Sequence, residues 1–116
     1  MGKVLSEVEF FAKDRVALLN LSIKDLDEHD LEMDDTRDII DMIMSINSVE
    51  AAALFREEST DVYRMSLRSK GKMEILSIAE AFGGGGHLYA AGAEIHGEYH
   101  EIMAKVKKLM LARMND

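Results

Sequence analysis

The chain has 116 residues, a formal net charge of −8 and no cysteine or proline. Its length and its 47% of hydrophobic residues suit one globular domain with a single core. No apolar run is long enough to cross a membrane, and the early acidic residues Glu7, Glu9 and Asp14 do not suit a signal peptide. The lack of cysteine excludes disulfides and thiolate metal sites, so we expect a cytoplasmic protein with no membrane partner. The acidic balance argues against stand-alone binding of long nucleic acid, but it allows a small phosphorylated ligand held by one or two local cations.

The first third of the chain predicts a helix, a strand and a second short helix. Residues 3–13 carry apolar side chains at helical spacing, at Val4, Leu5, Val8 and Phe11. Arg15–Ser22 is short and mostly apolar, as is typical of a buried strand. Ser22 and Asp25 have the spacing of a helix cap, which predicts a short helix over Ile23–His29.

An acidic segment, Glu28–Asp35, leads into a further helix. Its oxygen ligands raise the alternative of a metal site, but it lacks the residue order of a calcium loop, and we interpret it as a solvated connector. Asp34 or Asp35 is then expected to cap a helix over Thr36–Ile46. The predicted buried stripe of that helix is Ile39, Ile40, Ile43 and Ile46.

The second half of the chain predicts a β-hairpin and two further helices. Val49–Glu57 and Asp61–Ser69 read as its two strands, with the turn at residues 58–60. In the second strand, three apolar side chains alternate with Arg64, Ser66 and Arg68. One sheet face should therefore be polar and cationic, although an ordinary solvated face would show the same pattern.

A helix over Met73–Phe82, a short strand over Ala93–His96 and a helix over Glu98–Arg113 complete the element order. The expected buried stripe of the last helix is Ile102, Val106, Leu109, Met110 and Met114. The predicted fold class is α/β (α+β), with a small mixed β-sheet of about four strands flanked by helices.

Four consecutive glycines, Gly83–Gly86, follow the helix that ends at Phe82. Each glycine costs conformational entropy on folding, so the run indicates either close backbone approach or unusual backbone angles. One interpretation is a phosphate-binding loop with exposed N–H groups, with His87 at the start of a following helix and Ala90, Ala91 and Gly92 keeping the next turn small. The other is a loop that serves packing alone.

The best local chemistry is therefore anion capture by Arg68, the glycine loop and His87. No catalytic carboxylate pair or Ser-His-Asp set has supporting context in the sequence. A module that binds a phosphate-bearing ligand and a structural domain with a packing loop remain as the two main alternatives.

Two motifs in this order resemble a known family. Gly83–Gly92, read as Gly-Gly-Gly-Gly-His-x-x-Ala-Ala-Gly, looks like the signature of the DHH-associated C-terminal domain of the first type. Met65–Lys70 resembles the Ser-Leu-Arg-Ser strand end of that domain, and residues 78–82 resemble the helix before its loop. The similarity covers roughly residues 15–112. This domain closes phosphoesterases of the DHH family.

The resemblance implies that catalysis and substrate binding belong to two separate domains. In that family an N-terminal DHH domain holds manganese through ligands that include an Asp-His-His triplet, which is absent here. We therefore expect residues 1–14 to be a linker helix from such a catalytic domain and residues 15–116 to be the substrate-binding domain. The whole protein would be a manganese-dependent hydrolase, while this fragment would have no catalytic residue, no metal site and no cofactor of its own.

The family's functional residues carry over by position. The resemblance implies that the substrate-binding and phosphate-binding residues are Arg68, Ser69, Gly84, Gly85, Gly86, His87, Ala90, Ala91 and Gly92. Within the family the chain resembles most the nanoRNase type, which degrades short oligoribonucleotides and in some cases dephosphorylates 3′-phosphoadenosine 5′-phosphate. The runner-up is the single-strand exonuclease branch. Expected partners are a short oligonucleotide or nucleoside phosphate and the DHH domain of the same protein, and a homodimer stays open.

Overall fold

A six-stranded mixed sheet forms the centre of the computed structural model, which describes residues 8–28 and 33–114. The strands follow the order β1-β2-β3-β4-β6-β5 across the sheet. β2 and β3 pair in parallel, and the other neighbouring pairs are antiparallel. The strand bounds are β1 (Glu9–Phe11), β2 (Val16–Leu21), β3 (Ala51–Ser59), β4 (Val62–Ser69), β5 (Gly85–His87) and β6 (Ala90–His96). The prediction of a small mixed sheet is confirmed, and the two unexpected strands are the short edge strands β1 and β5.

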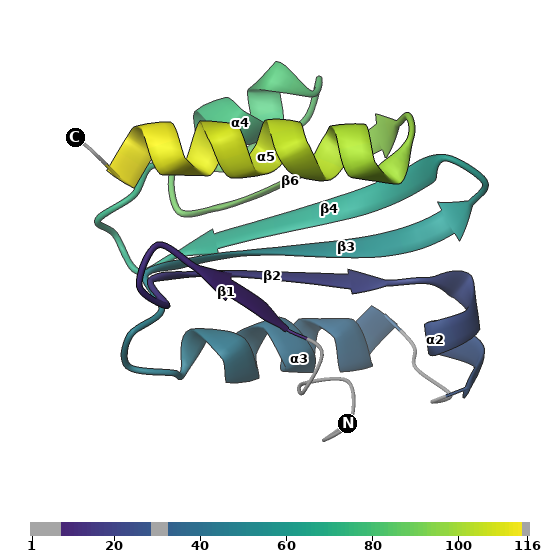
Figure 1. Ribbon diagram of the computed structural model, residues 1–116, viewed down its shortest axis with the longest axis horizontal. Helices are drawn as coiled ribbons and strands as arrows, with labels where there is room; N and C mark the ends of the chain where they lie inside the picture. The colour runs from purple at the N-terminus through teal and green to yellow at the C-terminus, as the bar shows by residue number, and fades with distance from the viewer. Residues whose placement is uncertain (1–7, 29–32, 115–116) are drawn as a thin grey trace.

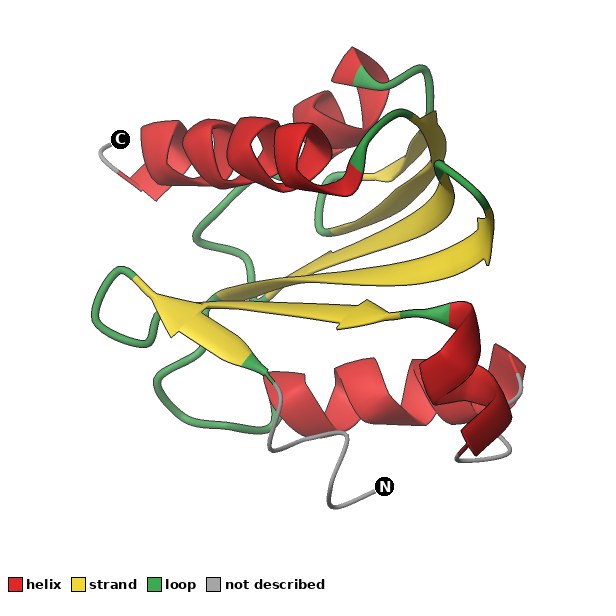
Figure 2. Ribbon diagram, turned by 45° about the vertical axis from the view of Figure 1, so that its right-hand side comes forward, coloured by secondary structure: helices red, strands yellow, loops and turns green. Residues whose placement is uncertain are grey.

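Helices cover both faces of this sheet (Figures 1 and 2). α4 (Leu76–Ala81) and α5 (Tyr99–Met114) lie on one face, and α2 (Ile23–Glu28) and α3 (Met33–Met44) lie on the other. The parallel β2–β3 pair needs a crossover connection, and the segment that carries α2 and α3 supplies it. No helix in the described ranges is long and apolar enough to span a bilayer.

Each helical layer has its own apolar core against the sheet. The first core packs α4 and α5 on side chains that include Phe55, Met65 and Leu67. The second packs Ile39, Ile40 and Ile43 of α3 on Leu19, Leu21 and Leu54. β3 is central, and its first five residues are buried on both faces. Its small side chains at Ala51–Ala53 let both layers approach closely.

The helix predicted over residues 3–13 is wrong where the structure describes it. Glu9–Phe11 form β1, which pairs with β2 through Phe10 and Ala17. Three residues with positive φ, Ala12, Lys13 and Asp14, then reverse the chain. Pairing with an established strand outweighs a short helical pattern, because propensity is a weak prior against tertiary context. Val4 and Leu5 lie outside the described residues, and the proposed domain boundary at residue 14 remains a prediction.

The helices on the second face also differ at their ends from the predictions. The cap at α2 is confirmed, since Asp25 N–H donates to Ser22 Oγ at 3.1 Å and Ser22 N–H donates to Asp25 Oδ2 at 3.0 Å. α3 begins at Met33, so Asp34 and Asp35 lie in its first turn and do not precede it as caps. It ends at Met44, and Ile46, predicted to be buried, is 40% exposed. Residues 29–32 of the acidic connector lie outside the described ranges.

The helices on the first face follow the predictions more closely. α4 is shorter than expected, and Met73 and Ile75 are buried ahead of its first turn. In α5 the predicted stripe is buried at Ile102, Val106 and Met110 and half-buried at Leu109 and Met114. Met103 joins the buried residues, which the sequence pattern did not single out.

The first two glycines of the run close α4. Gly83 has φ of 82°, and its N–H donates to Glu80 O at 3.0 Å. Gly84 N–H donates to Ala79 O at 2.8 Å. Together these bonds form a Schellman motif, in which a left-handed residue ends the helix and two N–H groups satisfy its last carbonyls. These two N–H groups are therefore occupied within the protein.

The rest of the run is an edge strand, so the helix expected after the glycines is absent. β5 pairs with β6 through Gly85 and Gly92, Gly86 and Ala91, and His87 and Ala90, and the turn is Leu88-Tyr89. The Schellman motif ends α4 and reverses the direction of the chain. This reversal favours a hairpin over a new helix. β6 accordingly begins at Ala90, three residues before the predicted strand.

Close backbone approach requires glycine at three positions, two in the run and one in β6. A Cβ on Gly84 would lie 2.1 Å from Gly92 O, one on Gly86 would lie 2.7 Å from Ala90 O, and one on Gly92 would lie 2.7 Å from Met65 O. A Cβ on Gly85 would meet nothing within 4 Å. The run thus combines glycines that packing demands with one that it does not.

We expect Gly84→Ala to lower the free energy of unfolding by about 3 kcal/mol, because its Cβ cannot fit without a backbone shift. Gly85→Ala should change the same quantity by less than about 1 kcal/mol. Urea denaturation of both variants measures the difference. Equal losses in the two variants would contradict this account of the hairpin.

A cluster of charges ties three loops together at one end of the sheet. The Glu50 carboxylate pairs with Arg15 and, at 3.4 Å, with Lys72 Nζ. The hydrogen bond from Arg15 is the main cause that lowers the pKa of Glu50 below its usual value. Backbone bonds reinforce the junction, since Lys70 N–H donates to Glu50 O at 2.9 Å.

A lowered pKa in the folded state means that Glu50 contributes stability above its unfolded pKa of about 4.3, and that this contribution is lost as the pH falls through the folded value. Glu50→Gln should therefore lower Tm at pH 7, and the difference from wild type should shrink toward pH 3. Glu58→Gln is the matched control, because Glu58 is exposed and makes no ion pair within the described ranges. A difference in Tm that stays constant with pH would argue against the assignment.

Candidate functional site

The strand register brings Arg68 and His87 onto one face of the sheet. Arg68 of β4 pairs with Ala90 of β6, and Ala90 pairs in turn with His87 of β5. Directly opposed residues of antiparallel strands project to the same side, so the three form one row across the sheet. Two strand spacings separate the outer members, which puts their Cα atoms about 10 Å apart. The small side chain of Ala90 between them leaves space above the row.

This row lies on the sheet face that also carries α3; it begins at the margin of that helix and extends away from it. α3 packs against β3 and β4, whereas β5 is exposed along its whole length. The side chains of Arg64, Glu94 and His87 are exposed on this face, and Arg68 is half-buried. The helix thus covers one half of the face and leaves the other half to solvent.

We call the solvent-exposed half of this sheet face, which carries Arg64, Arg68, His87 and Glu94, the open face. Its two arginines have no acidic partner among the described residues. Arg68 Nη1 donates to the neighbouring carbonyl of Leu67 at 3.0 Å, and the guanidinium makes no ion pair there. Arg64 likewise has no ion pair within residues 8–28 and 33–114. Glu94 stands opposite Arg64 on β6, but its carboxylate contacts His96 Nε2 at 3.3 Å. Arg68 therefore keeps most of its five N–H donors available for an anion.

The glycines contribute unequally to the open face. Gly84 N–H is occupied by Ala79 O, whereas Gly85 is exposed with free space where a Cβ would stand. β5 is an edge strand, and such strands present backbone groups that no neighbouring strand takes up. A ligand could approach the backbone at Gly85 more closely than at any residue with a side chain.

Three further predicted site residues, Ala91, Gly92 and Ser69, do not project from the row but support the strands that carry it. Ala91 is buried in the core under α4 and α5, and Gly92 packs against Met65 O. Ser69 alternates to the opposite face, where its Oγ accepts a hydrogen bond from Gly71 N–H at 3.2 Å. Its own N–H donates to Tyr89 O at 2.9 Å, which fixes the turn of the hairpin beside the end of β4. Ser69 thus positions the hairpin, and its side chain does not join the row.

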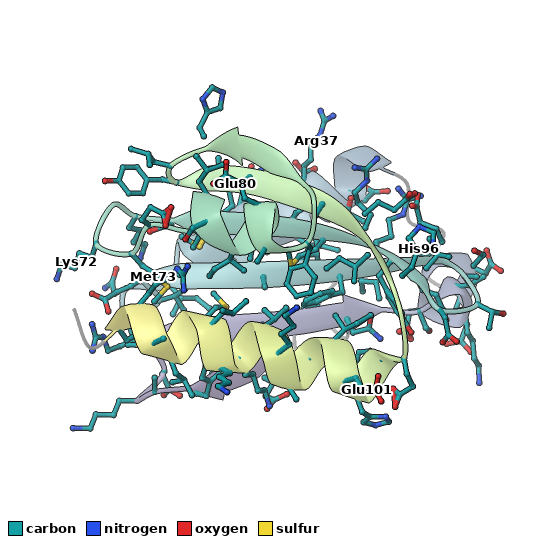
Figure 3. All side chains as sticks on the ribbon, turned by 90° about the horizontal axis from the view of Figure 1, so that it is seen from above. Arg37, Lys72, Met73, Glu80, His96 and Glu101 are labelled. Carbon is teal, nitrogen blue, oxygen red and sulfur yellow. The ribbon has the colours of Figure 1, made fainter. Side chains whose placement is uncertain are left out.

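The sequence patterns missed the contribution of α3 to this face. A pocket of about 220 Å³ lies between α3 and β4, lined by Thr36, Arg37, Ile40, Leu54, Arg64, Ser66 and Arg68. In Figure 3, Arg37 lies at the margin of the molecule across from Glu101 of α5. Helical periodicity marks Thr36 and Arg37 only as positions early in α3, so nothing local in the sequence indicates that they line a pocket together with Arg68.

Groups that could hold a metal ion are not found in the described residues. No three His, Asp or Glu side chains gather there with suitable spacing, and the pairs His96–Glu94 and His100–Glu98 stay separate.

Comparisons with known proteins agree on one family. The sequence profile of the DHHA1 domain matches residues 14–114. The chain is 33% identical over 100 residues to a probable bifunctional oligoribonuclease and PAP phosphatase NrnA of Streptococcus mutans, covering 84% of this chain and 32% of that protein. It is 31% identical over 97 residues to the NrnA of Thermus thermophilus, covering 84% of this chain and 28% of that protein.

A solved structure gives the same result for the fold. An exopolyphosphatase-related protein from Bacteroides fragilis superposes with a TM-score of 0.80 at 32% identity, covering 96% of this chain and 32% of that one. The chain thus spans about a third of the length of the relatives that it matches. The family resemblance inferred from the two motifs is confirmed: this chain belongs to the DHHA1 domain family.

Proposed function

We propose that this chain is the substrate-binding domain of a DHH-family phosphoesterase acting on short oligoribonucleotides or nucleoside bisphosphates. The row of Arg68, Ala90 and His87 carries the proposal, because it sets the Cα atoms of an arginine and a histidine about 10 Å apart on one open face. The names of the two NrnA relatives support the substrate class.

Arg68, His87 and Gly85 have distinct tasks in this proposal. Arg68 would bind a phosphate through paired N–H groups, because its planar fork matches phosphate oxygens. His87, exposed and without a side-chain hydrogen bond in the described ranges, would donate to a second oxygen of the ligand. Gly85 would let the ligand lie against the backbone. Cleavage itself would belong to a DHH domain of the same protein, whose manganese ions would activate the attacking water.

The interpretation that the glycines serve packing alone explains part of the run but not all of it. It explains Gly84 and Gly86 of the run, and Gly92 of β6, because their missing side chains let a neighbouring backbone approach closely. It gives no reason for glycine at position 85, where a side chain would fit. The single-strand exonuclease alternative is less favoured, because a net charge of −8 suits short ligands better than long strands.

The isolated chain is expected to lack phosphodiesterase activity, because two-metal hydrolysis needs a cluster of ligands that the described residues do not form. Incubation of the purified chain with manganese and a 5′-labelled trinucleotide should leave the substrate intact. Turnover that persists in the wild type and disappears in His87→Ala would show that the chain itself catalyses the reaction.

Weak binding of a short 5′-phosphorylated ligand should remain, with a Kd on the order of 0.1–1 mM, because only one half of the composite site is present. NMR titration should shift the amides of Gly85, His87 and Arg68. Arg68→Gln should weaken binding by about tenfold through loss of a charge-assisted contact. Lys108→Gln, an equal charge loss on the exposed side of α5, serves as the control. Unshifted amides at millimolar ligand would count against the binding role.

A further inference from the structure

The row of Arg68, Ala90 and His87 stands at the end of two strand ladders. Arg68 and Ala90 form the last pair between β4 and β6, and His87 and Ala90 form the last pair between β5 and β6. The end of a ladder opens more readily than its centre, because fewer neighbouring contacts hold it. β5 adds little support, since it has three residues and two of them are glycines. The geometry of the row therefore depends on what holds the chain beyond this end.

One backbone hydrogen bond continues the ladder past Arg68, since Ser69 N–H donates to Tyr89 O at 2.9 Å. The β4–α4 loop (residues 70–75) follows directly. Its second half is held by the buried side chains of Met73 and Ile75. Its first half, residues 70–72, is exposed and includes Gly71 with φ of 114°. Polar contacts must therefore hold the half of the loop that adjoins Ser69.

Glu50 supplies those contacts from the start of β3. Its backbone carbonyl accepts a hydrogen bond from Lys70 N–H at 2.9 Å, and its carboxylate lies 3.4 Å from Lys72 Nζ. Arg15 fixes the carboxylate in turn, and Glu50 N–H donates to Arg15 O at 2.6 Å. The side chain of Glu50 is 15% exposed and that of Lys72 is 80% exposed, so solvent screens the pair in part. A moderate but measurable effect on the loop follows.

We propose that Glu50 is a positioning residue for the ligand site. By holding Lys70 and Lys72 it keeps the bond between Ser69 and Tyr89 closed, and this bond keeps Arg68 in register with Ala90 and His87. Glu50 touches no ligand in this assignment and acts only through the β4–α4 loop. The inference rests on the proposed function, which it extends to a residue outside the row.

Hydrogen exchange in the free domain tests the structural part of this inference. Glu50→Lys places a third cation beside Arg15 and Lys72, so the amide of Ser69 should exchange about tenfold faster. The amide of Ile75, which donates to Leu88 O at 3.0 Å, should stay within about twofold, because the buried Ile75 side chain holds it independently. Adding Lys72→Glu to Glu50→Lys restores an ion pair with exchanged charges, and it should return the Ser69 rate toward that of wild type.

NMR titration with adenosine 5′-monophosphate tests the consequence for binding. Glu50→Lys should weaken binding by about threefold, because only the closed fraction of molecules presents the row. Glu9→Lys is the matched control: it makes the same charge change and removes the partner of Lys107 on β1, at the opposite edge of the sheet from β5. It should not weaken binding. The charge-exchanged double variant should recover the wild-type affinity within about twofold. If Glu50→Lys does not fold, Lys72→Gln serves in its place, with a smaller effect in the same direction.

The outcomes separate this inference from the function on which it rests. Equal acceleration of the Ser69 and Ile75 amides would show a general loss of stability and overturn the positioning role. Faster exchange at Ser69 with unchanged affinity would also overturn it, as would a charge-exchanged variant that restores neither quantity. If the wild type binds no ligand at millimolar concentration, the proposed function fails, and Glu50 is left only with control of the ladder end that the exchange rates measure.

Discussion

The close approach of three backbones at the glycine run is the constraint on which the open face depends. Gly84 and Gly92 lie so near each other that a Cβ on the first would meet the carbonyl of the second at 2.1 Å. The Schellman motif at Gly83 and Gly84 turns the chain into this contact, and the pairing with β6 then fixes His87 opposite Ala90. Because β6 also pairs with β4, the same contact sets the position of His87 relative to Arg68.

The partial cover of the second sheet face follows from where the apolar residues lie. β2 and the first half of β3 are apolar on both sides and need a helix on each. β4 carries Arg64, Ser66 and Arg68 on the side of α3, and β6 continues with Ala90, Gly92 and Glu94. A helix that covered these residues fully would bury charges without partners, at a cost of several kcal/mol for each. α3 instead packs mainly on β3 and reaches β4 only at its margin, which forms one wall of a pocket.

The elements with strong patterns could be predicted from the sequence, and those that depend on distant partners could not. Alternation along β4 placed Arg68 on the polar face, and the cap at Ser22 and Asp25 marked the start of α2. β1 could not be predicted because its three residues acquire their conformation by pairing with β2, and the glycines of β5 have no side chain to show alternation. Thr36 and Arg37 meet β4 only through the crossover, which no local pattern reports. The roles assigned to Arg68 and His87 come from the family motifs and stay predictions.

The net charge of −8 is compatible with the proposed binding of an anionic ligand at Arg68, because charge–charge interactions in salt solution are short-ranged. At physiological salt the Debye length is about 8 Å, so exposed charges farther away than that contribute little to the potential at Arg68. Two acidic residues, Glu58 near the end of β3 and Asp61 in the turn that follows, lie at the far end of β4 from Arg68. A ligand confined to the row experiences mainly the local guanidinium groups. If the proposed function holds, a longer strand that extends past Arg64 would pass toward Glu94 and the acidic end, so the charge distribution of the domain would limit the length of ligand that gains by binding.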